Sequence, residues 1–141
     1  MTAQNPSTVP FLPARPVEAE RRLLAVVYVS GSYSAPTPAG VEGHIRAASA
    51  WTTYLVELGF APICPHTNIQ QIGRLGYEDI MAVDFALLAL CRGIFMLPGW
   101  EKSPGAVRER HFAEQMGIPV FDSVEELLAS DLQRQPLPFH S

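Results

Sequence analysis

The strongest constraint on the fold is an apolar run without interruption, rich in β-branched residues, from Leu23 to Ser30 (LLAVVYVS). A strand that is apolar at every position must be covered on both faces, which is typical of a parallel sheet between helices. Gly31 ends the run. The following segment, from about Val41 to Leu58, carries apolar residues at steps of three or four, which predicts a helix.

The same alternation continues to the end of the chain. Short apolar runs typical of strands alternate with segments of helical spacing. A glycine, a proline or a capping serine stands at most of the boundaries between them. Strands that alternate with helices indicate a parallel sheet with right-handed crossovers, in which ligands bind at the carboxyl ends of the strands. The further predicted strands are Phe60–Cys64, Gly93–Leu97 and Ile118–Phe121, and the further helices run from about Tyr77 to Cys91, from Gly105 to Met116 and from near Ser123.

The length of 141 residues suits one domain. Residues 1–21 hold four prolines without a periodic apolar pattern, and we expect a disordered or loosely docked arm there. Residues 22–132 are predicted to form the domain, and residues 133–141 a tail.

Composition and charge restrict the partners. The net charge is −4 and the chain has no basic run, so duplex nucleic acid is not an expected partner, whereas a small anionic ligand is compatible. We find no secretory signal and no apolar stretch that would span a bilayer, so we expect a cytoplasmic protein without a membrane partner. Cys64 and Cys91 are not in a paired motif and are predicted to fill the core.

Two acidic residues stand on helix stripes that should face inward. Glu109 shares its stripe with Ala106, Ala113 and Met116. A solvent-facing Glu109 that favours the helix dipole is an equally good interpretation. Asp84 lies on the apolar stripe of the preceding helix; the alternatives are a local cap or a pair with Arg74 or Arg92. Paired carboxylates in an apolar site can provide one nucleophile or base and one acid. The stripe residues around Asp84 are Ile80, Leu87, Leu88 and Cys91.

Three loops should meet at the carboxyl ends of the strands. In the first loop, Gly31, Ser32 and Tyr33 offer a close backbone approach and hydroxyl groups to a phosphate or sugar, although a plain turn explains them as well. In the third loop, Ser103 is a predicted helix cap, and the amides near Gly105 suit an anion.

His66 and Trp100 complete the candidate ligand contacts. His66 lies in the second of these loops, where a ligand contact and a simple loop hydrogen bond are both compatible with the sequence. Trp100 precedes Ser103 and offers an aromatic face on which a base could stack. The four histidines do not have metal-ligand spacing, and we expect neither a metal nor a cofactor.

Four strings of this sequence together resemble the nucleoside 2-deoxyribosyltransferase-like superfamily. The resemblance covers roughly residues 24–121, and more narrowly the chain is similar to a bacterial and phage branch with the signature LPGWE-S-x-GA-x-x-E. It implies a flavodoxin-like or Rossmann-like three-layer α/β sandwich with a parallel sheet of four to five strands. The strings are YVSGSYS (Tyr28–Ser34), PICPH (Pro62–His66), YEDIMAVDFALLALC (Tyr77–Cys91) and LPGWEKSPGAVRE (Leu97–Glu109).

The resemblance also implies roles for single residues. Glu109 matches the glutamate that attacks the anomeric carbon of the sugar, and Asp84 the aspartate that protonates or orients the leaving base. Tyr28 matches the tyrosine that positions the nucleophile. Ser103 stands at a position where the transferases of the family often have an acid. Related nucleoside 5′-monophosphate hydrolases have a serine there that contacts the phosphate. Ser32 matches a small residue of the phosphate loop of the same hydrolases.

The expected function is therefore cleavage of the N-glycosidic bond of a nucleoside 5′-monophosphate or nucleoside through a covalent glycosyl-glutamate. The alternatives are a deoxyribosyltransferase that exchanges bases and a non-catalytic nucleotide-binding module. A phosphoribohydrolase of the cytokinin-activating type fits less well, because Pro98-Gly-Trp100 does not match its PGG-x-GT string. Arg92 and Ala82 depart from the family pattern, which affects the substrate more than the reaction. A homodimer or higher homo-oligomer is implied by the resemblance.

Overall fold

The computed structural model describes residues 24–65 and 75–132, all within one compact unit. Their four strands form a parallel sheet in the order β2-β1-β3-β4. This confirms the predicted parallel α/β architecture. The predicted arm, most of the second loop with His66, and the tail lie outside the described residues. The strands are β1 (Val26–Ser30), β2 (Ala61–Ile63), β3 (Gly93–Met96) and β4 (Val120–Phe121).

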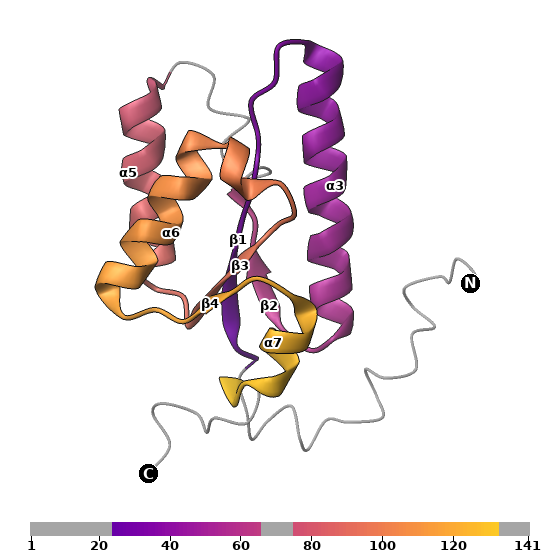
Figure 1. The fold of residues 1–141 in the computed structure, drawn as a ribbon, viewed down its shortest axis with the longest axis vertical. Helices are drawn as coiled ribbons and strands as arrows, with labels where there is room; N and C mark the ends of the chain where they lie inside the picture. The colour runs from indigo at the N-terminus through magenta and orange to yellow at the C-terminus, as the bar shows by residue number, and fades with distance from the viewer. Residues whose placement is uncertain (1–23, 66–74, 133–141) are drawn as a thin grey trace, which may run out of the picture. The chain divides into compact units, whose positions relative to one another are not determined.

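Helices cover both faces of the sheet. In Figure 1, α3 lies on one side of the strands, and α5 and α6 lie together on the other. The short helix α7 packs beside β4 on the α3 side. The result is a flavodoxin-like three-layer sandwich. The helical elements are α3 (Pro38–Glu57), α5 (Tyr77–Leu88), the 3-10 turn η2 (Trp100–Lys102), α6 (Pro104–Met116) and α7 (Val124–Ala129).

β1 divides its side chains between two apolar cores. Val27 and Val29 face α3 and belong to one core, whereas Tyr28 lies in the second core under α5 and α6. Ser30, two residues after Tyr28, extends the same face of the strand, because side chains alternate across a sheet. All four residues are fully buried, as the apolar run of the sequence predicts.

The ends of the helices follow local capping signals. Ser103 caps α6 by accepting a hydrogen bond from the Ala106 amide at 3.2 Å, as predicted, and Gly117 ends the helix with a φ of 75°. The helix α3 begins at Pro38, three residues before the predicted Val41, because Thr37 provides its cap. The helix α5 ends at Leu88, three residues before the predicted Cys91, in a turn that leads into β3.

The strand order reverses beside the end of β1. The chain crosses from β1 to β2 on one side, and β3 then pairs with β1 on the other side. Open α/β sheets bind ligands at such a reversal, outside the carboxyl ends of the strands. Ser30 and its register partner Met96 mark this edge, which positions the site described below.

Replacing Gly93 with alanine should destabilise the fold. A Cβ atom there would lie 2.8 Å from Phe121 Cε2 and 3.1 Å from Leu132 Cδ1, so the core would have to shift, at a cost of about 1–3 kcal/mol. Urea denaturation measures the change. The matched control is Gly43→Ala in α3, where nothing lies within 4 Å of the new Cβ; this change should stabilise by about 0.5–1 kcal/mol. Equal stability of the two variants would contradict the packing described here.

Candidate active site

Glu109 lies at the centre of the candidate site, with both carboxylate oxygens held by hydroxyl groups. Its side chain is 5% exposed and points from α6 towards β1. Tyr28 Oη donates a hydrogen bond to Glu109 Oε2 at 2.8 Å. Ser30 Oγ donates a second one to Oε1 at 2.6 Å. The prediction that Glu109 faces inward beside Tyr28 is confirmed, and the solvent-facing alternative is wrong.

The local sequence explains how a glutamate reaches this position. Ser103 and Pro104 fix the start of α6, so that Glu109 falls in its second turn, close to the carboxyl ends of the strands. Ala106 and Ala113 stand on the same stripe and are buried. Their small side chains allow the helix backbone to approach the sheet, which brings the Glu109 carboxylate within reach of the β1 hydroxyl groups.

Asp84 reaches the same point from α5. It is 5% exposed, and its carboxyl group interacts with both Glu109 and Tyr28. The oxygen Oδ1 of Asp84 is buried and has no hydrogen-bond partner among the described residues. No ion pair joins Asp84 to Arg92 in the part of the chain that the structure describes, and Arg74 lies outside that part. The predicted acid pair is therefore present.

Burial shifts the titration of all three groups. The pKa of Glu109 is raised to about 8, mainly by burial and also by the neighbouring Asp84 carboxyl. Burial likewise raises the pKa of Asp84. The pKa of Tyr28 is raised by burial and then by the charges of the two acids, so the phenol stays protonated and remains a donor. Two adjacent buried carboxyl groups do not both ionise at low cost, so the pair retains one proton at neutral pH.

The arginines on either side of Glu109 in the sequence turn away from it. Arg108 forms two hydrogen bonds with Glu78, at 3.0 and 3.2 Å, and packs over the Tyr77 ring. Arg110 pairs with Asp122. Among the described residues, neither acid of the pair forms an ion pair with lysine or arginine. No such ion pair therefore offsets the effect of burial on the pKa of Glu109.

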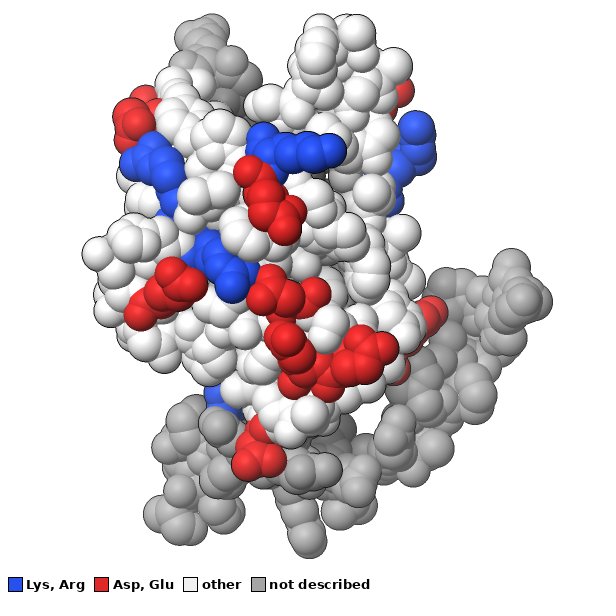
Figure 2. Space-filling model, in the orientation of Figure 1, with Lys and Arg blue, Asp and Glu red and all other residues white. Residues whose placement is uncertain are grey.

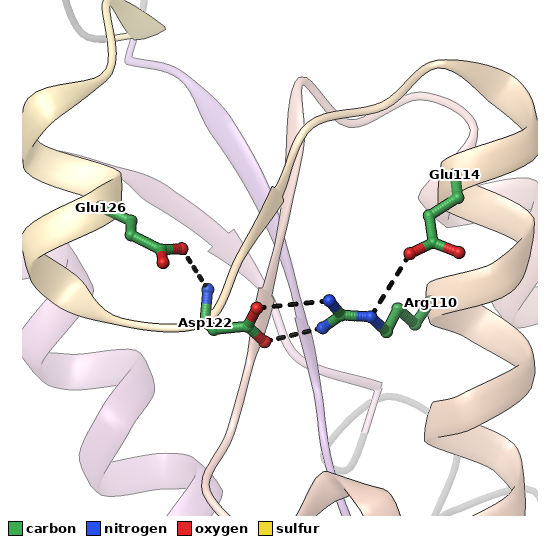
Figure 3. A network of polar contacts seen from close by, with 4 residues as sticks. All are labelled: Arg110, Glu114, Asp122 and Glu126. Carbon is green, nitrogen blue, oxygen red and sulfur yellow. Dashed lines mark hydrogen bonds and ion pairs between the residues drawn. The ribbon is translucent and has the colours of Figure 1, made fainter.

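Arg110 instead connects α6 to the loops after β3 and β4. Figure 3 shows its guanidinium between Asp122 and Glu114, with the closest Asp122 contact at 2.7 Å. The Asp122 amide in turn donates to Glu126 Oε1 at 2.9 Å. Arg110 also lies 4.5 Å from the centre of the Trp100 ring. One face of Trp100 is thus covered by a cation.

The surface charge is unevenly distributed. On the face drawn in Figure 2, acidic side chains gather over α7, whereas the basic side chains lie singly. The predicted absence of a duplex nucleic-acid partner stays a prediction. Of the helices that the structure describes, none combines the length and the apolar character that a membrane span needs.

The first predicted ligand loop follows directly after β1, which carries Tyr28 and Ser30. Gly31 is buried against Leu97, and a Cβ atom on it would lie 2.9 Å from Leu97 Cβ, so the close approach requires glycine. Ser32 is half-buried, and Tyr33 is exposed. The Tyr33 carbonyl lies 3.1 Å from His44 Nδ1, which joins the loop to α3. The loop follows Ser30 directly in the sequence, and its contacts with a ligand stay a prediction.

The third predicted ligand loop places Gly105 and Trp100 in different surroundings. Gly105 lies in the first turn of α6 and faces α5, where an added Cβ would be 3.7 Å from both Tyr77 Oη and Met81 Sδ. A hollow of about 340 Å³ near the ends of β3 and β4 includes Trp100 and Glu101 in its lining but not Glu109. This hollow does not reach Glu109, and the stacking role of Trp100 stays a prediction.

Ser30 is the site residue that the sequence prediction missed. Its place in the apolar run predicts only the end of a strand, yet its hydroxyl group makes the shorter of the two hydrogen bonds from β1 to Glu109. The sequence carries a signal for it, because Tyr28 is a candidate and a residue two positions later lies on the same face of a strand. Within residues 24–65 and 75–132, no group of three or more His, Cys, Asp or Glu side chains could hold a metal ion.

Comparison with known proteins identifies a family but not an activity. Residues 25–122 match the family described as "Domain of unknown function (DUF4406)". This region holds every element from β1 to β4 and the three residues that surround the Glu109 carboxylate. No curated protein matches the chain. Because the match spans more than half of the 141 residues, the chain belongs to the DUF4406 family.

Proposed function

We propose that the protein cleaves the N-glycosidic bond of a nucleoside 5′-monophosphate or nucleoside, through a covalent intermediate on Glu109. The observation that carries the proposal is the buried acid pair at the sheet reversal. Glu109 is held at both oxygens by Tyr28 and Ser30, and Asp84 lies beside it. A buried carboxylate is costly without a partner or a function. A purely structural role would not explain why Asp84 Oδ1 is left without a hydrogen-bond partner among the described residues.

The surroundings of the two acids differ in a way that assigns their roles. Two hydroxyl groups donate to Glu109, which favours its charged form. A phenol has a single hydroxyl proton, and Tyr28 uses it to donate the hydrogen bond to Glu109 Oε2. Burial raises the pKa of Asp84, and its Oδ1 has no hydrogen-bond partner among the described residues, so we assign the shared proton to Asp84 in the reactive form. The pair then offers one nucleophile and one general acid.

The reaction proceeds in two displacements at the sugar C1′. An oxygen of Glu109 forms a bond to C1′ while the C1′–N bond breaks, and the electron pair of that bond leaves with the base. Asp84 gives its proton to the departing base nitrogen. Water then attacks C1′ and Asp84 takes a proton from it, which releases Glu109 as a carboxylate and returns the proton to the pair. Two inversions give net retention at C1′.

A phosphate on the substrate is supported by the start of α6. Helix amides near Gly105 and the hydroxyl group of Ser103 lie at a helix N-terminus, which favours anions. The resemblance to nucleoside 5′-monophosphate hydrolases, with serine at positions 32 and 103, supports the same substrate class. It also supports water as the acceptor, since the transferases of the superfamily often carry an acid where Ser103 stands.

A panel of nucleosides and 5′-monophosphates tests the proposal. The protein is incubated with each compound, and free base is measured by chromatography. Release of base in water supports the hydrolase. Release that requires a second base, with formation of a new nucleoside, indicates the transferase instead. Tight binding without any release across the panel would overturn the proposal in favour of a nucleotide-binding module.

Replacing Tyr28 with phenylalanine should lower kcat/KM by about 10- to 100-fold. The ring still fills the core, but Glu109 Oε2 loses its donor at 2.8 Å. Hydrogen bonds to charged groups typically contribute about 1.5–3 kcal/mol, which corresponds to this range. The control is Tyr54→Phe, the same change on the exposed side of α3. An equal rate in the Tyr28 variant and the control would show that the phenol does not support the nucleophile.

A further inference from the structure

We propose that Ser30 is a positioning residue, which fixes the orientation of the Glu109 carboxylate and holds it ready for attack. The inference deepens the proposed function and rests on it for its kinetic test. It starts from a contact rather than from the resemblance: Ser30 Oγ lies 2.6 Å from Glu109 Oε1, between side chains that are 79 residues apart in the chain.

The geometry shows why two donors are needed. A glutamate side chain has three rotatable bonds, and one hydrogen bond to Oε2 would leave the carboxylate free to turn about that contact. Tyr28 and Ser30 stand two residues apart on β1, so their hydroxyl groups reach the two oxygens from one rigid strand. The carboxylate plane is thereby set by the sheet. Each oxygen accepts one bond from these donors and keeps a second lone pair, which is available for attack.

The buried surroundings of Ser30 leave its hydroxyl group dependent on the hydrogen bond to Glu109. Ser30 is 0% exposed, and its backbone carbonyl is already used by the Leu97 amide at 2.8 Å. Its register partner Met96 is apolar and nearly buried. A hydroxyl group in this environment requires a partner, and Glu109 provides it. Reciprocally, the Ser30 donor lowers the pKa of Glu109 and so opposes the effect of burial.

The first test measures Glu109 directly and needs no substrate. The full chain is labelled with ¹³C at glutamate carboxyl carbons, and the buried Glu109 resonance is titrated by NMR. Removing a hydrogen bond to a carboxylate should raise its pKa by about one to two units in Ser30→Ala. Ser30→Thr keeps the hydroxyl group and should titrate as the wild type does. An unchanged titration in Ser30→Ala would overturn the proposal.

The second test uses the pH dependence of base release. In Ser30→Ala the acidic limb of the kcat profile should move to higher pH by a similar amount, with KM changed little. Ser30→Cys, which is close in size but a weak donor, should behave like Ser30→Ala, and Ser30→Thr should restore the wild-type limb. A loss of rate with an unmoved limb in both Ser30→Ala and Ser30→Cys would reduce Ser30 to a packing residue.

The two tests separate this inference from the function on which it rests. If no compound of the panel releases base, the proposed function fails, and the NMR titration still decides whether Ser30 holds the Glu109 carboxylate. If Ser30→Ala does not fold, Ser30→Cys and Ser30→Thr supply the same comparison, since both retain a heavy atom at the Oγ position.

Discussion

Glu109→Gln should reduce base release by at least about 10³-fold, the largest effect of any single change in this site. The amide has nearly the shape of the carboxylate, but it is a poor nucleophile and cannot form a glycosyl ester at a useful rate. Removing a catalytic nucleophile costs several orders of magnitude in characterised enzymes. The measurement is the initial rate of base release at saturating substrate, for the best compound of the panel.

Glu114→Gln is the matched control, since it places the same substitution on the same helix. Glu114 is about half exposed, and its carboxylate pairs with Arg110 at 3.4 Å. Its variant should keep the wild-type rate within about two-fold, because an exposed ion pair contributes little to stability or positioning. Equal rates in the Glu109 and Glu114 variants would exclude Glu109 as the nucleophile.

The second large effect concerns stability and pH. The pKa of Glu109 is about 8 in the folded protein, against an ordinary value of 4.5. Between these two pH values the folded chain retains a proton that the unfolded chain has lost, so the free energy of unfolding should fall as the pH rises. The slope for one such group is at most about 1.4 kcal/mol per pH unit. The Glu109 contribution is complete above about pH 8.

Urea denaturation of the wild type and Glu109→Gln at several pH values isolates this contribution. Below pH 4.5 the two proteins should be similarly stable, because Glu109 is neutral in both the folded and the unfolded wild type. Above that pH the variant should become the more stable protein, by a margin that grows up to about pH 8. A constant difference across the range would show that Glu109 titrates normally, and hence that burial does not control its charge. A gain in stability when a buried carboxyl group of a functional site is removed is a common trade-off.

The main features of the fold could be predicted because its signals are local. The apolar run up to Ser30 specifies a strand buried on both faces, and Ser103-Pro104 specifies where α6 begins. The errors lie at helix ends, where Thr37 caps α3 earlier than its apolar spacing suggests. The sequence predicts only a loop where η2 follows β3, since three residues carry too little pattern to define an element.

The acid pair was predictable for a similar reason, whereas its surroundings were not. Glu109 and Asp84 break an apolar stripe, and such a break is visible in a sequence. Ser30 breaks no pattern, because a serine at the end of a strand is also an ordinary turn residue. Only the packing of α6 on β1 shows that its hydroxyl group meets Glu109.

The neighbouring arginines illustrate the same difference. Arg108 and Arg110 flank Glu109 in the sequence and, from the sequence alone, could have neutralised it. The helix turns them about 100° to either side of Glu109. There Arg108 pairs with Glu78, and Arg110 pairs with Asp122, which follows β4. These partners depend on how α5, α6 and β4 pack, which no local pattern in the sequence specifies.

The central claim is a covalent bond between Glu109 and the sugar, and mass spectrometry of a trapped intermediate tests it most directly. A 2′-fluoro analogue of the best substrate slows the second displacement, because the electron-withdrawing fluorine destabilises the oxocarbenium-like transition state. After incubation and acid quench, the peptide that contains Glu109 should gain the mass of the fluorinated sugar, or of its phosphate. Release of base from the analogue with no sugar adduct, or with the adduct on another residue, would contradict the account.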